Sequence, residues 1–137
     1  MQESMPHREL TVIHPQSARQ GTQEPSSFFG ISAQSAGATA ISMRLVEIAP
    51  GSQGEPHYHP EFETAIYVLA GRIETRYGEG LHESVTNEAG SFLFIPPNIL
   101  HQPINLNATQ PALAIVARND AREEENVVLN KQFCNCT

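Results

Sequence analysis

Apolar and polar residues alternate along much of the chain, in short runs that end at glycine, proline or polar clusters. A period of two is typical of a half-buried β-strand, because successive side chains of a strand point to opposite faces. The alternation is clear over residues 38–48, where Ile41, Met43 and Leu45 share one face. Helical spacing is nearly absent. The pattern therefore predicts an all-β protein, either a barrel or a sandwich.

Further runs that favour strands are rich in β-branched or aromatic residues and are bounded by turn residues. They comprise residues 9–13, 65–69, 72–77, 92–95, 112–118 and 127–129. The run 112–118 is also compatible with a buried helix, because it is apolar almost throughout. Gly71 separates the second run from the third, so we expect these two to form a hairpin. Residues 84–88 predict a polar connection, and the acidic residues 120–125 predict the start of one short helix.

The length and composition of the chain suit one domain with a modest core. It has 137 residues, of which 39% are hydrophobic. We expect a single domain over residues 1–137, with flexible tails at 1–8 and 131–137. No apolar run approaches the roughly 18 residues of a membrane helix, and the N-terminus lacks the basic and apolar order of a signal peptide. A cytoplasmic location is therefore expected.

Charge and cysteine content limit the kinds of partner and ligand that we expect the protein to bind. The formal net charge is -7 and the pI is near 5.3, so phosphate backbones and anionic lipids are repelled rather than attracted. We therefore expect neither nucleic acid nor a membrane as a partner. Cys134 and Cys136 lie in the last four residues, where they cannot staple a core. They predict a reduced tail, because two ligands without neighbouring partners make a weak metal site.

Three histidines are the candidate functional residues of the chain. His57 and His59 are two residues apart, so in an extended strand both imidazoles point to the same face. A third nitrogen has to come from another strand, and His101 follows the predicted strand 92–95 after a Pro-Pro-Asn turn. Neutral imidazole is the commonest metal ligand in proteins. The three rings therefore predict a shared metal ion. His7, His14 and His82 belong to no such group, so we expect them at the surface.

The segments that contain these histidines resemble the two motifs of the cupins. The first motif pairs a His-x-His with a later acid between two glycines, and it is matched by Gly51, His57, His59, Glu63 and Gly71. The second motif places a proline, a histidine and an asparagine after a glycine, and it is matched by Gly90, Pro96, His101 and Asn105. The motifs lie at 51–71 and 90–105. Agreement of two spaced motifs is a far stronger signal than one His-x-His.

The resemblance implies a double-stranded β-helix, in which two antiparallel sheets roll into a jelly-roll-like barrel. It also implies one divalent metal ion, held near the barrel mouth by His57, His59, Glu63 and His101. The ligand set suits Fe, Mn, Ni, Co, Cu or Zn. A homodimer is expected as well, because dimers are common among such proteins.

The chain departs from the family pattern at two positions. Asn98 stands where the second motif has glycine, and asparagine tolerates positive φ better than most residues. The commonest spacing of the first motif puts the acid at position 64, which is Thr64 here, while the carboxylate is at Glu63. Adjacent strand residues face opposite sides, so Glu63 reaches the ion only through a bulge. Glu61 is one alternative fourth ligand, and water is another.

Several residues are candidates for the surroundings of the metal. Tyr67 and Gln102 are possible catalytic or substrate-orienting groups, and Tyr58, Arg44 and Arg76 are further polar candidates. The residues expected in the core, some of them next to the pocket, are Met43, Phe92, Phe94, Ile104 and Val116. Asn105 is expected to bond the backbone near the second motif.

Such a centre favours a metal-dependent enzyme acting on a small-molecule substrate, with a non-haem dioxygenase as the leading hypothesis. An isomerase, a lyase or a cyclase of polyketide-type substrates is an alternative that uses the metal as a Lewis acid. A non-catalytic cupin that binds a small molecule is a third hypothesis. The sequence selects neither the metal nor the substrate.

Overall fold

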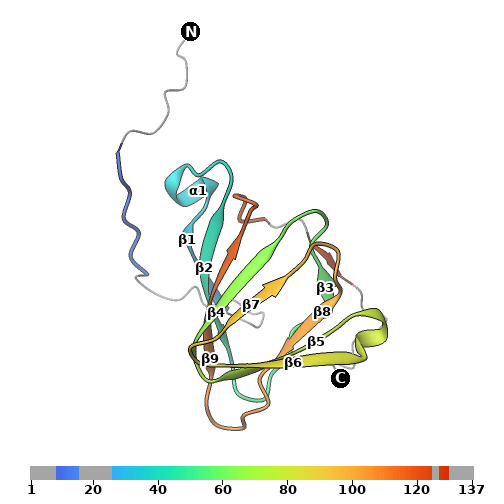
Figure 1. Cartoon of the computed structure of the whole chain (residues 1–137). Coiled ribbons are helices and arrows are strands. Elements are labelled where there is room, and N and C mark those ends of the chain that lie inside the picture. Colours follow the sequence, from blue (N-terminus) through green and yellow to red (C-terminus); the bar gives the residue numbers. More distant parts are fainter. Residues whose placement is uncertain (1–8, 16–25, 125–126, 130–137) are drawn as a thin grey trace.

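The computed structural model describes residues 9–15, 26–124 and 127–129, and its strands form two antiparallel sheets (Figure 1). The strands and helices are β1 (Ser26–Ile31), α1 (Ala33–Ala36), β2 (Ser42–Ile48), β3 (His57–Tyr58), β4 (Thr64–Ala70), β5 (Arg72–Tyr77), η1 (Glu79–Leu81), β6 (Glu83–Glu88), β7 (Phe92–Ile95), β8 (His101–Ile104), β9 (Ala112–Arg118) and β10 (Val128–Leu129). No helix in this part of the chain is long and apolar enough to cross a membrane.

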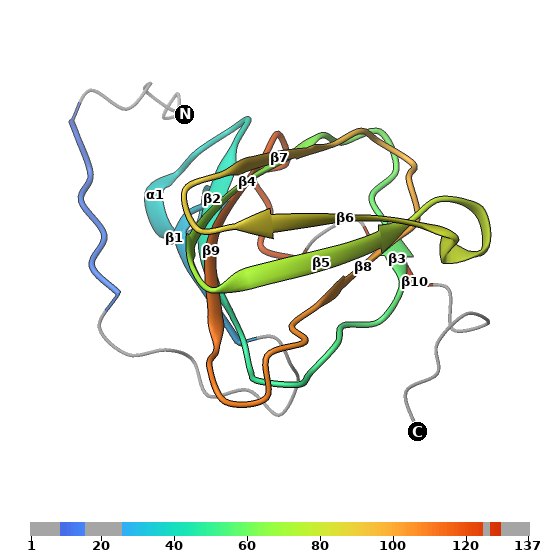
Figure 2. The same cartoon turned by 60° about the horizontal axis from the view of Figure 1, so that its bottom comes forward.

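Within the described residues, each sheet contains five strands. Sheet A has the order β1-β2-β9-β4-β7, and sheet B has the order β10-β3-β8-β5-β6. Figure 2 shows the two sheets as the walls of one barrel, with β5 and β6 of sheet B toward the viewer. Hydrogen-bonded neighbours are mostly far apart in sequence, because the chain crosses repeatedly from one sheet to the other. The expected all-β double-stranded β-helix is therefore confirmed.

The hairpin expected around Gly71 is wrong. β4 pairs with β7 and β9 in sheet A, while β5 pairs with β6 and β8 in sheet B. Gly71 is thus the point where the chain changes sheets. Its φ is +82°, and a Cβ there would lie 2.9 Å from the carbonyl oxygen of Pro111. Glycine meets both demands, because it has no Cβ and adopts positive φ without strain.

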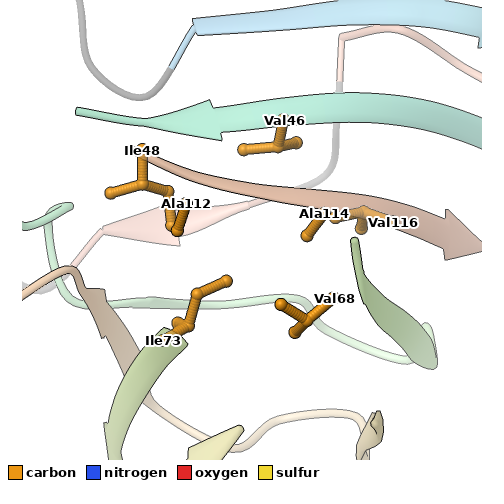
Figure 3. Packing of buried hydrophobic residues seen from close by; sticks show 7 residues of the cluster. All are labelled: Val46, Ile48, Val68, Ile73, Ala112, Ala114 and Val116. Atoms are coloured by element: carbon orange, nitrogen blue, oxygen red, sulfur yellow. The ribbon is translucent and has the colours of Figure 1, made fainter. Parts of the chain in front are cut away.

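The hydrophobic core lies between the sheets, where side chains of β2, β4 and β9 face Ile73 of β5 (Figure 3). β2 and β9 supply alternate residues to it, β4 supplies Val68, and Ile73 of β5 closes it from the opposite sheet. The core residues are Val46, Ile48, Val68, Ile73, Ala112, Ala114 and Val116. Val68 is fully buried, and burial of such a side chain stabilises the fold by about 1.5–3 kcal/mol.

The same alternation exposes an apolar outer face on sheet A. Met43, Phe92 and Phe94 are 44%, 79% and 57% exposed, so their assignment to the core is wrong. Other residues fill the inward positions of these strands. A period of two separates the two faces of a strand but does not tell which face points to the core. Ile104 and Val116 are buried as expected.

Three further expectations are corrected by the structure. Residues 9–13 form no strand, because no neighbouring strand pairs with them in the described part of the chain. Residues 84–88 belong to β6, an edge strand that pairs with β5 despite its polar sequence. Residues 120–124 contain no helix.

The strands at 92–95 and 112–118 are confirmed as β7 and β9. Cys134, Cys136 and the expected tails lie outside the described residues.

Candidate metal centre

The structure brings His57, His59 and His101 together, one side-chain nitrogen of each lying within 4.8 Å of the others. His57 opens β3 and stands directly opposite His101, which opens β8. His59 follows β3, and its carbonyl oxygen accepts a hydrogen bond of 3.1 Å from the backbone N–H of Asn98. Nitrogens that share an ion at about 2.0–2.1 Å lie at most about 4.2 Å apart. Small ring movements therefore suffice to place all three on one ion.

Two of the rings are oriented by the backbone in the same way. Nδ1 of His57 lies 2.8 Å from the carbonyl oxygen of Glu55, and Nδ1 of His101 lies 2.8 Å from that of Ile99. A carbonyl oxygen only accepts, so each Nδ1 carries the proton and each Nε2 presents a lone pair. Metal-binding histidines are commonly fixed by this kind of outer hydrogen bond.

His59 is the least satisfied polar side chain at the site. Its ring is only 3% exposed, and neither ring nitrogen has a hydrogen-bond partner among the described residues. Burial of an unpaired polar group is costly. A metal ion would give one nitrogen a partner, so the donor set fits a metal.

The histidines are held in the neutral form that binds metals. Burial lowers the pKa of His59 to about 3, assisted by the positive charge of Arg118 and by the other two rings. Burial likewise lowers the pKa of His101 to about 4, with His57 as the next cause. A metal therefore has no proton to displace from these two rings near neutral pH.

Glu63 does not lie with the histidines in the structure. Its side chain is exposed, and its backbone N–H donates a 2.8 Å hydrogen bond to Oδ1 of Asn119. Thr64 takes the inward position and is 2% exposed. Glu61 is also exposed, with a φ of +68°. Among the described residues, the group that can hold a metal thus consists of three histidines without a carboxylate.

The two proposed catalytic side chains also lie elsewhere. Tyr67 belongs to the outer face of sheet A, where its ring packs on Phe92 with centroids 4.7 Å apart. Gln102 follows His101 on β8 and so faces the opposite side of sheet B. Its Nε2 donates a 2.8 Å hydrogen bond to the carbonyl oxygen of Gly54. Gln102 therefore anchors the loop before β3. Asn98 has a φ of +67°, as its place in the turn requires.

A mostly apolar pocket of about 240 Å³ opens beside the cluster, between β7 and the strands β5, β6 and β8. Residues that line it include Thr75, Tyr77, Leu93, Ile95, Ile99 and His101. Tyr77 is paired directly with His101 across β5 and β8, and its hydroxyl lies 3.3 Å from a carboxylate oxygen of Glu83. No sequence signal pointed to Tyr77, because this register is set by tertiary pairing. A larger hollow of about 710 Å³ beside Gly71 is lined by no histidine of the described part of the chain.

Proteins of known sequence resemble this chain over its central part. Residues 44–117 match the family described as "Cupin domain". Germin-like protein 8-9 of Oryza sativa subsp. japonica is 30% identical over 98 residues, which are 68% of this chain and 43% of that protein. Germin-like protein subfamily T member 3 of Arabidopsis thaliana is 35% identical over 92 residues, 64% of this chain and 39% of that protein. The chain thus spans about two fifths of these relatives.

Solved structures share the fold at lower identity. A recombinant oxalate oxidase in complex with glycolate has a TM-score of 0.68 and 23% identity, covering 82% of this chain and 59% of its own. Bacillus subtilis oxalate decarboxylase has a TM-score of 0.70 and 18% identity, covering 86% and 30%. An uncharacterized Klebsiella pneumoniae protein with a double-stranded β-helix domain has a TM-score of 0.68 and 17% identity, covering 96% and 98%. The matched family segment includes all three histidines and more than half of the residues, so the chain belongs to the cupin family.

Proposed function

We propose that this cupin is a metal-dependent enzyme that acts on a small organic molecule, with a non-haem dioxygenase as the leading candidate. His59 carries the proposal, because a buried ring with two unpartnered nitrogens is costly without a ligand. A divalent ion bound by His57, His59 and His101 relieves that cost. The proposed ligand set is these three histidines, and Fe, Mn, Ni, Co, Cu and Zn all suit it.

The chain's own residues prepare the site for this chemistry. The carbonyl oxygens of Glu55 and Ile99 fix the rings of His57 and His101, so that both Nε2 lone pairs face the cluster. Burial keeps His59 and His101 in their neutral forms. When bound, a metal ion supplies a Lewis acid for a carbonyl or enolate oxygen or, if it is iron, a site for dioxygen.

The pocket beside His101 sets the size of the proposed substrate. Its volume of about 240 Å³ lies just below the roughly 300–1,000 Å³ of ordinary small-molecule sites. Leu93, Ile95 and Ile99 give it apolar walls, while Thr75 and Tyr77 bring hydroxyl groups. A small molecule with one polar end and a short apolar part fits this lining. The names of the structural neighbours, oxalate oxidase with glycolate and oxalate decarboxylase, are compatible with a small substrate.

Two alternatives use the same residues. An isomerase, lyase or cyclase needs the Lewis acid alone, and a non-catalytic binding protein needs only the pocket and the ion. Three neutral ligands leave coordination positions open for either. Reaction with dioxygen separates the leading hypothesis from both alternatives, because only an oxygenase consumes it.

Elemental analysis of the purified protein is the first test. We expect close to one equivalent of a transition metal in the wild type and a loss of most of it in His57→Ala and His59→Ala. His82→Ala removes an exposed histidine outside the cluster and serves as the matched control. Unchanged metal content in both cluster variants, with the fold retained by circular dichroism, would refute the metal site.

Oxygen uptake then tests the reaction class. The iron-loaded protein is mixed with small enols, diketones, phenols and hydroxy acids in an oxygen electrode. Uptake that depends on one of these compounds and is lost in His59→Ala supports the dioxygenase. Product formation without uptake favours the isomerase, lyase or cyclase. Metal binding with no turnover on the panel favours the binding protein.

A further inference from the structure

The pocket beside His101 lies where the two sheets end without pairing. β6 and β7 are the last strands of sheets B and A, and no ladder joins them within the described residues (Figure 1). Val85 of β6 and Phe94 of β7 both line the pocket and are exposed, whereas Thr75 and His101 line it and are buried. The pocket therefore connects the surface between β6 and β7 with the buried side chain of His101.

Thr75 is a buried polar residue of this pocket that the fold leaves without a partner. It is 4% exposed and stands on β5 between Val85 of β6 and Pro103 of β8. Its hydroxyl makes no hydrogen bond with another described residue. The oxygen is not fully enclosed either, so it faces the space that the side chain lines. A buried hydroxyl without a partner is costly.

Packing alone does not explain a threonine at position 75. Valine has almost the same shape and an equal preference for strands, and it buries no hydroxyl. The neighbours on the inner face of sheet B also suit an apolar residue, since Val85 lies directly opposite Thr75 and Ile73 belongs to the core. A ligand that hydrogen-bonds to the hydroxyl inside the pocket gives the threonine a reason.

The second hydroxyl of the pocket is already engaged. Tyr77 stands directly opposite His101 of β8 on one side and Glu83 of β6 on the other. Its hydroxyl lies 3.3 Å from a carboxylate oxygen of Glu83, so a donor and an acceptor satisfy each other. Within the described residues, no Asp, Glu, Lys or Arg lines the pocket. An apolar lining next to the carboxylate of Glu83 disfavours an anionic group.

We propose that Thr75 is the specificity-determining residue of this pocket, and that its hydroxyl binds a hydroxyl or carbonyl oxygen on the uncharged part of a small substrate. The substrate enters between β6 and β7 and reaches the histidines with its other end. The inference rests on the proposed function, because it takes the pocket as the substrate site. It adds to the proposed substrate a second polar oxygen, one that does not meet the metal.

Ligand binding to the metal-free protein tests this contact without any assay of turnover. Phenol and fluorobenzene have nearly the same shape, but only phenol carries a hydroxyl. Each is titrated while the methyl NMR signals of Ile95 and Ile99 report on the pocket and that of Ile48, in the core, serves as the reference. We expect the ratio of the Kd of fluorobenzene to the Kd of phenol to fall by about tenfold in Thr75→Val.

Tyr77→Phe is the matched control, because it removes the hydroxyl that Glu83 already engages. The Kd ratio should change by less than about twofold in this variant and in Thr75→Ser, which keeps the hydroxyl. Thr75→Val should melt at or above the wild-type temperature, because it removes a buried hydroxyl that has no partner. A stable variant with a lower Kd ratio separates a ligand contact from a structural role.

Benzoate and its neutral analogue benzamide test the charge of the ligand on wild-type protein. We expect benzoate to bind at least about tenfold more weakly, because its carboxylate loses its hydration in an apolar lining. This comparison needs no variant to fold. Equal binding of the two compounds overturns the uncharged class.

The remaining outcomes separate this inference from the proposed function. A Kd ratio that is unchanged in Thr75→Val, or that falls equally in Tyr77→Phe, overturns the role of Thr75. Wild-type protein in which Ile95 and Ile99 respond to none of the four compounds overturns it as well. Metal content is measured separately, so a protein that shows the Thr75 effect but holds no metal keeps the ligand contact and refutes the proposed function.

Discussion

His57 and His101 stand directly opposite each other across the antiparallel pair of β3 and β8, with ring centroids 4.3 Å apart. The two sequence motifs therefore meet through the register of one strand pair. Each ring also uses Nδ1 to bond the carbonyl two residues before it. Backbone pairing thus brings the two motifs together, and burial of His59 and His101 disfavours the charged forms of these two rings.

That burial predicts an acid-sensitive metal-free protein. The folded pKa values of about 3 for His59 and about 4 for His101 lie below the ordinary value of 6.5. Below pH 6.5 the unfolded chain takes up protons that the folded chain does not, so the free energy of unfolding falls as the pH falls. The loss continues to about pH 4 for His101 and about pH 3 for His59, at no more than about 1.4 kcal/mol per pH unit for each.

Denaturant unfolding of metal-free wild type and His59→Gln between pH 7 and pH 4 measures this effect. Carboxylates titrate in both proteins, so the difference between the two curves isolates one histidine. We expect the variant to lose less stability than the wild type over this range. Parallel curves would show that His59 is not held neutral by the fold.

Asn105 is predicted to contribute strongly to the stability of the loops that its side chain contacts. It is 1% exposed, and its Nδ2 lies 3.0 Å from the carbonyl oxygen of Ile48 and 2.9 Å from that of Gln110. Its Oδ1 accepts from the backbone N–H of Asn107. The structural role expected from the sequence is confirmed. Asn105→Ala leaves these buried groups unpaired and should lower the free energy of unfolding by about 2–4 kcal/mol.

Chemical denaturation of Asn105→Ala checks this value against Asn107→Ala. Asn107 makes similar backbone bonds through Oδ1 but is exposed, so water replaces them. We expect a loss below about 1 kcal/mol for the control. Equal losses in the two variants would contradict the role assigned to burial.

The sequence predicted the histidines well because their signal is chemical and local. His57 and His59 need only the period of a strand, and His101 needs only the spacing of its motif. Glu63 is different, because one residue of register decides whether a strand side chain faces in or out. The turn before β4 places Thr64 inward, and no composition signal reveals that choice.

Long-range pairing explains the expectations about the fold that the structure corrects. Residues on both sides of Gly71 look like a hairpin locally, but β4 pairs with β7 and β9, and β5 pairs with β6 and β8. Phe92 and Phe94 have the composition of a core and lie on the outside, because the inner positions of β7 belong to Leu93 and Ile95. Local sequence located most of the strands, but it misplaced those at 9–13 and 84–88, and it did not determine which strands pair or which face points inward.

The exposed outer face of sheet A is the surface on which we place the expected homodimer. Phe92, Phe94 and Met43 are exposed there, and apolar patches of this kind mark interaction sites in soluble proteins. Leu10 and Val12, 98% and 75% exposed on an extended segment, give a second copy further apolar side chains to bury. Light scattering after gel filtration should give the mass of two chains for wild type and of one chain for Phe94→Ser. A monomeric wild type would refute this contact.

Glu63 provides the sharpest test of the ligand set. Its exposed carboxylate lies outside the histidine group, and only its backbone is fixed, by Asn119. Glu63→Gln should therefore keep the metal content and change the apparent Kd for Co²⁺ by less than about twofold, whereas loss of a ligand costs at least about tenfold. Calorimetric titration of Glu63→Gln beside His57→Ala makes the comparison. A tenfold loss in both variants would show that the start of β4 shifts by one residue when metal binds, which would bring Glu63 inward and turn Thr64 outward.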